Sequence, residues 1–564
     1  MKNWIVKNTD ESPSTEGIHP NIAKLLASRG IRTREEVEEF LSPEPRKTYD
    51  PFLLKGMREA VEKIRMHIGR GSRICIYGDY DVDGVTAICL VFEFLQNLTD
   101  NLEWYIPVRQ QEGYGINKEA LQKIKERGAD LMISVDCGIS SVDEVRFAEE
   151  IGLDTIITDH HTPGETIPGG VVINPKQPGC PYPYKELCGC GVAYKLIQAL
   201  QRTLGLSRKT IKKGLDLVGV ATIADIVPLL DENRTLVKYG LKAVNARKRV
   251  GLASLIHCIG GNFAEKTLSS TDVAFILGPH INAGGRVDTA ESSLRLLMTD
   301  DKHEAEALAY QLIDNNNLRK SLQTRGLDLA ERYLKDRDNR LLVLVEGEDI
   351  HEGVAGIVAG KLKEEYYRPT LIVTESEKPG VLKGTGRSID SVNLYELLKT
   401  QEHLLLTFGG HKAACGFSLK AENLPAFRAG LEEVLEKRLK EEPDLLDERL
   451  ELDGVLDLAE ADNDFGWMLE KLEPFGQQNQ RPLFGIFGVY IENLAFVGKE
   501  REHSRFTLRD IHGNALDCIM FNSEERFRGQ EVSGKRFDFA GRINMNYRAG
   551  SYNIQLIPVD FKRS

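Results

Sequence analysis

Five short apolar segments between residues 73 and 173 alternate with helical patterns. The expected strands are 73–77, 102–107, 131–135, 154–158 and 170–173. Short apolar strands separated by helices favour a parallel sheet with helices on both faces, because parallel strands need long crossover connections. The sequence therefore predicts an α/β fold with a parallel, doubly wound sheet in this region.

The remaining patterns divide the chain into further parts, as its 564 residues are too many for one hydrophobic core. A second strand–helix region follows a long polar helix, and the C-terminal part has short strands with turns, typical of a small β-barrel of the oligonucleotide-binding (OB) kind. We expect an N-terminal helical segment at 1–66, the first α/β domain at 67–300, a connector helix at 301–340, a second α/β domain at 341–441 and the barrel at 450–564.

Composition and charge limit the class of protein. The chain has 41% hydrophobic residues and a formal net charge of -12. This charge argues against a uniformly basic surface for nucleic acid but allows a local basic groove, because binding follows the distribution of charge. The start, MKNWIVKNTDESPS, lacks the apolar core of a signal peptide, and no apolar run is long enough to span a bilayer. We expect a cytoplasmic protein that does not bind membranes.

The nine cysteines are scattered along the chain. Cys188 and Cys190, with Cys180 upstream, could suggest a zinc site, but there is no C-x-x-C pair and no matched pair of histidines. We therefore expect free thiols in a reducing compartment.

Acidic and imidazole side chains gather in four motifs. These are YGDYDVDG with Asp79, Asp81 and Asp83, ISVDCG with Asp136, TDHHTPG with Asp159, His160 and His161, and ATIADIVPL with Asp225. The first three motifs follow expected strands directly, and ligands of open α/β sheets bind at that edge. Two carboxylates about 4 Å apart repel by about 4 kcal/mol at an effective dielectric constant of about 20, which a bound cation would offset. Carboxylates with imidazoles suit Mn²⁺ or Mg²⁺.

Each motif also has a structural interpretation. A single aspartate after a strand is usually a turn former or a helix cap, and a His-His pair is more often part of a solvated loop. The D-x-D-x-D-G run is harder to explain in this way, because side chains two residues apart share one face of an extended segment. Four such motifs in one sheet therefore favour a metal site.

The motifs GDYDVDG, VDCG, DHH and ADIVPL resemble, in this order, those of the DHH phosphoesterase superfamily. Within it, the chain resembles the bacterial exonucleases that degrade single-stranded DNA from the 5′ end. The similarity covers nearly the whole chain from about residue 20 and includes the motifs IPVRQQEGYGIN, INPKQPGCPYP, GPHINAGGRV, HEGVAGIVAGKL, GTGRS, GGHKAACGF and EPFGQQNQRPLF. It implies a DHH catalytic domain, a connector helix, a DHH-associated substrate-binding domain and an OB-fold domain that binds nucleic acid.

The resemblance also implies a site for two Mn²⁺ or Mg²⁺ ions. The implied ligands are Asp81, Asp83, Asp136, His160 and Asp225, with Asp136 bridging the two ions. The implied catalytic residues are Asp136, His160 and His161, of which His161 contacts the scissile phosphate and could act as general acid. Some relatives carry a histidine where this chain has Tyr77, and we expect Asp79 to replace it as a metal ligand.

The expected substrate-binding residues lie in four motifs. They are Arg109 and Tyr114 in VRQQEGYG, Arg286 in INAGGRV, Arg387 and Ser388 in GTGRS, and Gly409, Gly410 and His411 in GGHKAACG. Glycine beside arginine lets the backbone approach a phosphate closely. Without the resemblance, Arg286 would be read as a surface residue and Tyr114 as a core residue. The family usually has Ala-Ala-Gly where this chain has Ala414-Cys415-Gly416, a small change in bulk.

The implied activity is the two-metal hydrolysis of single-stranded DNA from the 5′ end to 5′-mononucleotides, in DNA repair and recombination. The implied partners are single-stranded DNA, a single-strand-binding protein and a RecQ-type helicase, and the chain is expected to act as a monomer. One alternative is a DHH phosphodiesterase for short oligoribonucleotides or cyclic dinucleotides, which generally lacks the barrel. Another is a non-catalytic single-strand-binding replication factor, which would lack ligand carboxylates.

Overall fold

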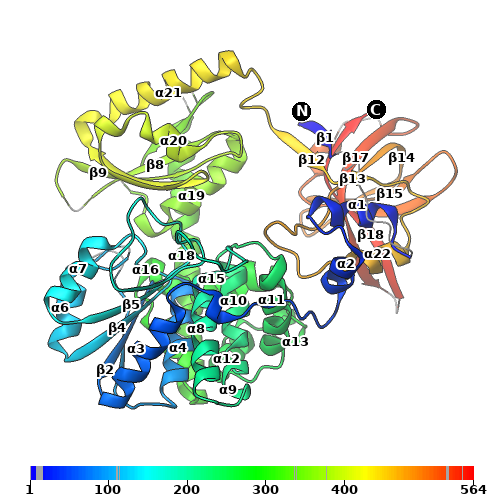
Figure 1. Ribbon diagram of the computed structural model, residues 1–564. Coiled ribbons are helices and arrows are strands. Elements are labelled where there is room, and N and C mark those ends of the chain that lie inside the picture. The colour runs from blue at the N-terminus through cyan, green and yellow to red at the C-terminus, as the bar shows by residue number, and fades with distance from the viewer. Residues whose placement is uncertain are drawn as a thin grey trace. The chain divides into compact units, whose positions relative to one another are not determined.

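The computed structural model describes residues 2–7, 17–108, 112–113, 115–335, 337, 339–347, 349–376, 378–528, 532–548 and 551–564. The chain forms two compact units. Figure 1 labels their helices and strands and colours the chain from the N-terminus to the C-terminus. One contains residues up to Asn3, Asn282–Ser292 and Tyr310–Arg449. The other contains Trp4–Ile281, Ser293–Ala309 and Leu450–Ser564.

A five-stranded parallel sheet forms the centre of the larger unit. Its strands are β2 (Arg73–Gly78), β3 (Leu102–Tyr105), β4 (Ala129–Val135), β5 (Asp154–Thr158) and β6 (Val171–Ile173). They are ordered β3-β2-β4-β5-β6, and all four pairings are parallel. The predicted parallel sheet is confirmed.

Helices cover both faces of this sheet because successive side chains of a strand point to opposite sides. The surrounding helices are α3 (Met57–Arg70), α4 (Val82–Leu95), α6 (Lys118–Glu126), α7 (Val142–Glu150) and α8 (Gly189–Thr203). Leu121 of α6 and Val145 of α7 share a core with Cys75 and Tyr77 of β2. Gly78 instead meets Ile88 of α4, so α4 lies on the opposite face.

A helical layer follows the sheet in sequence. It consists of α9 (Lys209–Lys212), α10 (Leu215–Ala224), α11 (Asp231–Asn245), α12 (Val250–Ile259), α13 (Gly261–Glu265), α14 (Ser270–Asp272), the π-helical turn η2 (Val273–Leu277), α15 (Gly278–Ile281) and α17 (Glu291–Met298). Helices α10 and α11 cross at two glycines, where a Cβ built on Gly219 would lie 2.7 Å from the Cα of Gly240. This close contact fixes α10, which ends at the metal-site candidate Asp225.

The second sheet lies in the smaller unit. Its strands are β7 (Val343–Glu346), β8 (Thr370–Glu375), β9 (Val381–Arg387), β10 (Leu405–His411) and β11 (Ala414–Lys420), in the order β10-β11-β9-β8-β7. The helices of this region are α16 (Ala283–Val287), α19 (Glu352–Tyr366), α20 (Leu394–Lys399) and α21 (Leu424–Glu441). Leu342 and Leu344 face one core with α20 and α21, while Val343 and Val345 face another with α19.

The predicted connector is the 33-residue helix α18 (Lys302–Leu334). Its last turns are anchored, because Ala330 and Leu334 are buried in the core that contains α19. The helix is therefore a connector whose C-terminal end is part of the second α/β domain.

The C-terminal strands close into a barrel, as predicted. The strands are β14 (Phe484–Val497), β15 (His503–Arg509), β16 (Ala515–Met520), β17 (Arg536–Arg548) and β18 (Ser551–Arg563). They run β14-β15-β16-β18-β17, and the additional β14–β17 pairing closes the ring. Smaller elements around it are β1 (Asn3–Val6) paired with β12 (Arg449–Leu452), β13 (Gly454–Val455), α22 (Asn463–Glu470) and α23 (Glu524–Phe527).

The helices predicted at 1–66 are shared between two cores. Helices α1 (Pro20–Ser28) and α2 (Arg34–Leu41) pack against the barrel, where Ile22 and Phe40 join the core that contains Phe484. Helix α3 instead packs beside the first sheet. The sequence predicted helices in this segment, but not which core they join.

All nine cysteines are free thiols, as expected. Among the described residues, no helix combines the length and the apolar character needed to cross a membrane.

Candidate metal centre

The first acidic motif lies in the turn between β2 and α4. The side chain of Asp81 caps α4 by accepting a hydrogen bond of 3.1 Å from the backbone N–H of Gly84. Asp83, in the first turn of α4, accepts hydrogen bonds from the backbone N–H groups of Gly189 (2.6 Å) and Cys190 (2.7 Å) at the start of α8. A carboxylate at a helix N-terminus is stabilised by these otherwise unpaired donors. The position of Asp83 is thus fixed from two sides.

Asp136 follows β4 in a left-handed backbone conformation with φ of 61°. Such a conformation is uncommon for residues other than glycine and is concentrated at functional sites. A Cβ built on Gly189 would lie only 2.4 Å from Oδ1 of Asp136. Glycine at 189 therefore leaves the space that the Asp136 carboxylate occupies.

Asp159 holds the two histidines that follow it. Its carboxylate accepts hydrogen bonds from the backbone N–H groups of Ile139 (2.9 Å), His160 (2.7 Å) and His161 (3.0 Å). It also lies 2.8 Å from Nδ1 of the His161 ring. Asp159 is buried, whereas the His161 side chain is 46% exposed. Asp159 thus orients the imidazole of His161, which stays half-exposed.

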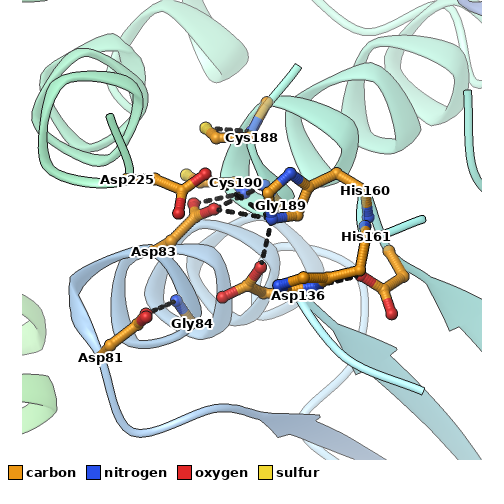
Figure 2. A network of polar contacts seen from close by, with 12 residues as sticks. Asp81, Asp83, Gly84, Asp136, His160, His161, Cys188, Gly189, Cys190 and Asp225 are labelled. Atoms are coloured by element: carbon orange, nitrogen blue, oxygen red, sulfur yellow. Dashed lines mark hydrogen bonds and ion pairs between the residues drawn. The ribbon is translucent and has the colours of Figure 1, made fainter. Parts of the chain in front are cut away.

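His160 lies at the centre of the site. Its Nε2 is 3.2 Å from Oδ1 of Asp136, 3.6 Å from Oδ2 of Asp225 and 3.8 Å from Oδ2 of Asp83. Figure 2 shows these side chains converging from α4, from the end of β4 and from the end of α10. Side chains that are up to 142 positions apart in the sequence, from Asp83 to Asp225, therefore lie together at one edge of the sheet.

Ligand atoms of two sets lie close enough to hold a metal ion. Asp83, His160 and Asp225 form one set, and Asp79, Asp81 and Asp136 form the other, with atoms within 4.8 Å of one another in each. A further group of this kind contains Asp136 and Asp159 with both histidines. None of the groups found among the described residues contains a cysteine, which agrees with a hard cation rather than zinc bound by thiolates.

The electrostatics of the cluster favour a cation. Burial raises the pKa of Asp136, and the neighbouring negative charges of Asp83 and Asp81 raise it further. Burial and Asp83 raise the pKa of Asp225 in the same way. Burial lowers the pKa of His160 to about 4, so its ring is neutral at neutral pH and has a lone pair to donate. The raised pKa values of Asp136 and Asp225 arise where carboxylates repel one another in a dry site, and a bound cation would lower both again.

Apart from the ion-pair contacts of Nε2 of His160 given above, several buried polar atoms in the cluster have no hydrogen-bond partner in the described part of the chain. They are Oδ1 of Asp136, Oδ2 of Asp225 and both ring nitrogens of His160. Leaving buried polar atoms without partners is costly, and such atoms need a physical explanation. A bound divalent metal ion would be the partner of these atoms. The side chains of the cluster therefore suit such an ion.

Tyr77, which stands where some relatives have a histidine, has another role. Its hydroxyl donates a hydrogen bond of 2.7 Å to the backbone carbonyl of Gly115, and its ring stacks on Tyr105 with the centroids 5.5 Å apart. The tyrosine is fully buried in the core between the sheet and α6. The place of Asp79 beside Asp81 and Asp136 is compatible with its expected role, which stays a prediction.

Comparison with known proteins gives a consistent result over the whole chain. Residues 73–222 match the DHH family, N-terminal domain, residues 338–437 match the DHHA1 domain, and residues 452–560 match the RecJ OB domain. The single-stranded-DNA-specific exonuclease RecJ of Bacillus subtilis is 38% identical over 96% of this chain and 68% of its own length. The RecJ of Escherichia coli is 33% identical over 95% of both chains.

The chain belongs to the RecJ family. The crystal structure of Thermus thermophilus RecJ in complex with Mn²⁺ matches with a TM-score of 0.81 and 31% identity, over 100% of this chain and 80% of that one. The same RecJ has also been solved in complex with Mg²⁺ and matches with a TM-score of 0.76. The DHH domain, second α/β domain and OB barrel expected from the sequence are those of a RecJ protein.

The two arginines expected to bind substrate in the second half of this RecJ-family chain both contact α19. Nη1 of Arg286 lies 3.3 Å from the carbonyl of Gly353. A Cβ built on Gly356, one turn further along α19, would lie 2.9 Å from Nη2 of Arg387. The two arginines, far apart in sequence, thus contact the same helix within the smaller unit.

The Gly-rich segment lies on neighbouring strands of the same sheet. Arg387 on β9 pairs with Ala414 on β11, and Ala414 pairs with His411 on β10. Gly409 and Gly410 continue β10 opposite Gly416 and Cys415, and Ser388 is buried just after β9. The structure brings these predicted residues together, while Arg109 and Tyr114 lie outside the described residues.

Two residues of the metal centre were not assigned a role from the sequence. Asp159 was recognised only as part of the DHH motif, although it orients both histidines. Asn174 was not singled out, yet its Nδ2 donates a hydrogen bond of 2.9 Å to the carbonyl of His161. Asn174 lies in the motif INPKQP, and its contact with a residue 13 positions earlier exists only in the fold.

Proposed function

We propose that this RecJ-family chain is a metal-dependent exonuclease specific for single-stranded DNA. The observation that carries the proposal is the convergence of Asp83, Asp136 and Asp225 on His160, in a chain that matches RecJ over nearly its full length. The relatives are named single-stranded-DNA-specific exonucleases. The RecJ OB domain match argues against a short-oligonucleotide phosphodiesterase, and the complete ligand set argues against a non-catalytic binding factor.

The site would hold two divalent cations, Mn²⁺ or Mg²⁺. Asp83, His160 and Asp225 would hold one, and Asp79 and Asp81 the other. Asp136 belongs to the second set and also lies 3.2 Å from Nε2 of His160, which supports a bridging role. When bound, such a pair activates a water and stabilises the attacking and leaving oxygens of an in-line displacement.

The residues of the chain supply positioning and proton transfer. His161 would contact the scissile phosphate, which its orientation by Asp159 and its half-exposed side chain support. Burial alone would lower the pKa of His161, but the hydrogen bond and charge of Asp159 outweigh it and raise the pKa. A raised pKa keeps the ring of His161 protonated up to a higher pH than an ordinary histidine, and the protonated ring would neutralise phosphate charge or protonate the leaving oxygen.

Arg286 and Arg387 would bind phosphates of the strand. Both guanidinium groups lie beside α19, next to glycines that let a backbone phosphate approach. The OB barrel would add contacts with the bases of the strand. On it, Trp467 and Tyr552 are 44% and 47% exposed, and their ring centroids are 4.9 Å apart. Exposed aromatic rings on OB folds stack on bases without sequence preference.

The finer details of the proposal follow from the resemblance. They are 5′→3′ polarity, release of 5′-mononucleotides, action as a monomer, and cooperation with a single-strand-binding protein and a RecQ-type helicase that supply the strand. A cytoplasmic location is supported by the nine free thiols, which suit a reducing compartment.

The proposal is tested with purified protein, Mn²⁺ and oligonucleotides labelled at either end. We expect release of a 5′ label as mononucleotide from single strands, little attack on blunt duplex, and loss of activity in Asp136→Asn. The exposed variant Asp143→Asn on α7 is the matched control. Equal attack on short RNA with none on long DNA would show that the function is a different one.

A further inference from the structure

Ile226 is an exposed aliphatic residue directly beside the metal centre. Its side chain is 69% exposed, although isoleucine is among the residue types most often buried. It follows Asp225, whose Oδ2 lies 3.6 Å from Nε2 of His160. Neighbouring Cα atoms are about 3.8 Å apart, so the Ile226 side chain lies within reach of any nucleotide whose phosphate is bound at the cluster.

The backbone of Ile226 is also strained. Its φ is 59°, in the left-handed region, and this is a genuine outlier for a β-branched residue. Its N–H makes only a long contact of 3.4 Å with the carbonyl of Ile223. Glycine or asparagine would adopt this conformation at lower cost. The conformation of Ile226 therefore costs stability and is not explained by burial of the side chain.

The residues after Ile226 hold it in this conformation. The carbonyl of Pro228 accepts hydrogen bonds from the hydroxyl of Tyr184 (3.2 Å) and from Nδ2 of Asn233 (3.0 Å). The N–H of Leu229 donates to the carbonyl of Gln477 at 2.9 Å, and the Leu229 side chain is buried. Before it, Asp225 caps α10. The chain is anchored on both sides, which is how strained residues persist at functional sites.

From this geometry we propose that Ile226 packs against the base of the nucleotide whose phosphate lies at the metal centre. An aliphatic side chain can neither bind a cation nor donate a hydrogen bond, so it serves the apolar part of a substrate. Every base has an apolar face, so such a contact is tolerant of sequence, as a general nuclease requires. The inference rests on the proposed function and adds a positioning residue to it.

The test compares Ile226→Gly, Ile226→Asn and Ile226→Leu with the unchanged chain on single-stranded DNA in Mn²⁺. Gly and Asn relieve the strain and remove the apolar surface, whereas Leu keeps that surface. We expect KM to rise about tenfold for Gly and Asn, as for the loss of one buried aliphatic contact, with kcat changed much less and KM near normal for Leu. Resistance to urea should stay about equal in the Gly and Asn variants, because the relief of strain in the folded chain offsets the greater flexibility of the unfolded chain.

A second substrate locates the contact. On a strand whose 5′-terminal residues are abasic, the ratio of KM between Ile226→Gly and the unchanged chain should fall towards one. Arg247→Gly is the control for strain, since Arg247 has φ of 53° in the turn after α11 and lies outside the metal cluster. It should leave KM unchanged.

The failures of the two proposals are distinguishable. If the unchanged chain does not degrade single-stranded DNA, the proposed function is wrong. If it does, and Ile226→Gly has the same KM, or the same KM ratio on abasic and normal strands, the role of Ile226 is wrong while the function stands.

Discussion

The carboxylate of Asp83 accepts a hydrogen bond of 2.6 Å from the backbone N–H of Gly189, 106 residues later in the chain. The same glycine leaves room for Asp136, because a Cβ at this position would lie 2.4 Å from Oδ1 of that residue. One residue without a side chain thus positions two carboxylates of the metal centre. The start of α8 serves as their common support.

Gly189→Ala should therefore disrupt the metal centre. The added methyl group collides with the Asp136 carboxylate, and one of the two must move. We expect the affinity for Mn²⁺ to fall about 10–100-fold, the range typical when groups that orient metal ligands are changed, with nuclease activity falling accordingly. Calorimetric titration with Mn²⁺ measures this. Gly191→Ala is the matched control, since its nearest contact would be an ordinary 3.4 Å, and equal losses in both variants would contradict the argument.

Asp79→Asn should weaken binding of one of the two cations. Asp79 is buried beside Asp81 and Asp136, and an amide carries no charge to balance a cation. We expect titration with Mn²⁺ to show one tight and one weakened site, and activity to require more metal. Asp143→Asn, on an exposed face of α7, should titrate like the unchanged chain. Full activity and metal affinity in Asp79→Asn would exclude Asp79 as a ligand.

Asp159→Asn should lower kcat more than it changes KM. The carboxylate accepts backbone hydrogen bonds from His160 and His161 and contacts the His161 ring. An amide of the same shape keeps one acceptor oxygen but loses the charge that orients the imidazole. We expect a drop in kcat of about 10–100-fold, as for other changes behind a metal-site histidine, with the far-UV circular dichroism unchanged. A variant with normal kcat would show that the orientation of His161 does not limit catalysis.

Arg234→Met should separate the barrel from the first α/β domain. Arg234, only 2% exposed, donates hydrogen bonds to the carbonyl of Phe40 and to the carbonyls of residues 471–473. Methionine leaves these acceptors buried without donors, at a cost of about 3 kcal/mol or more in the free energy of unfolding. Urea denaturation should become biphasic as the two parts unfold separately. The variant Arg208→Met changes an exposed residue beside α9 and should unfold like the unchanged chain.

Lys238 should make stability depend on pH. Burial, together with the charges of Arg234 and Lys242, lowers the pKa of Lys238 to about 7, against an opposing effect of Glu39. Its Nζ donates to the carbonyl of Ser42 at 2.6 Å. The unfolded chain holds this proton up to a higher pH, so the contribution of Lys238 to stability increases as pH rises from about 7 towards 10.

Urea denaturation of Lys238→Met at several pH values tests this effect. The methionine side chain does not titrate, so the stability of the variant relative to the unchanged chain should be highest below pH 7 and should decline as pH rises. A difference that is constant between pH 6 and pH 9 would contradict the lowered pKa. Lys238 donates to the carbonyl of Ser42, the residue that ends α2. The pH dependence therefore also reports on the contact that anchors the end of this helix.

Much of the fold was predictable because it depends on local patterns. The apolar runs at 73–77 and 131–135 have the length of buried strands, and each is followed by a helical pattern. Such alternation permits few topologies, since parallel strands need crossovers of one hand. The acidic residues after these runs were bound to lie at the carboxyl edge of the sheet. The second α/β domain and the barrel followed from the same kind of pattern.

Other features depend on contacts between distant segments and have no local signal. The apolar faces of α1 and α2 predict burial but are equally suited to either core, and only the assembled chain places them on the barrel. Asp159 looks like any aspartate after a strand until its four hydrogen-bond donors are seen together.

The sequence by itself determined which residue types reach the edge of the sheet, because strand and helix periods fix where a side chain points relative to its own element. The tertiary structure alone decided that Gly189 positions Asp83, that Asp225 meets His160, and that Ile226 is held strained beside them. Packing between elements sets distances at the scale of an ångström, and metal binding depends on that scale. The sequence contains the candidate ligand residues, whereas their arrangement in space exists only in the folded chain.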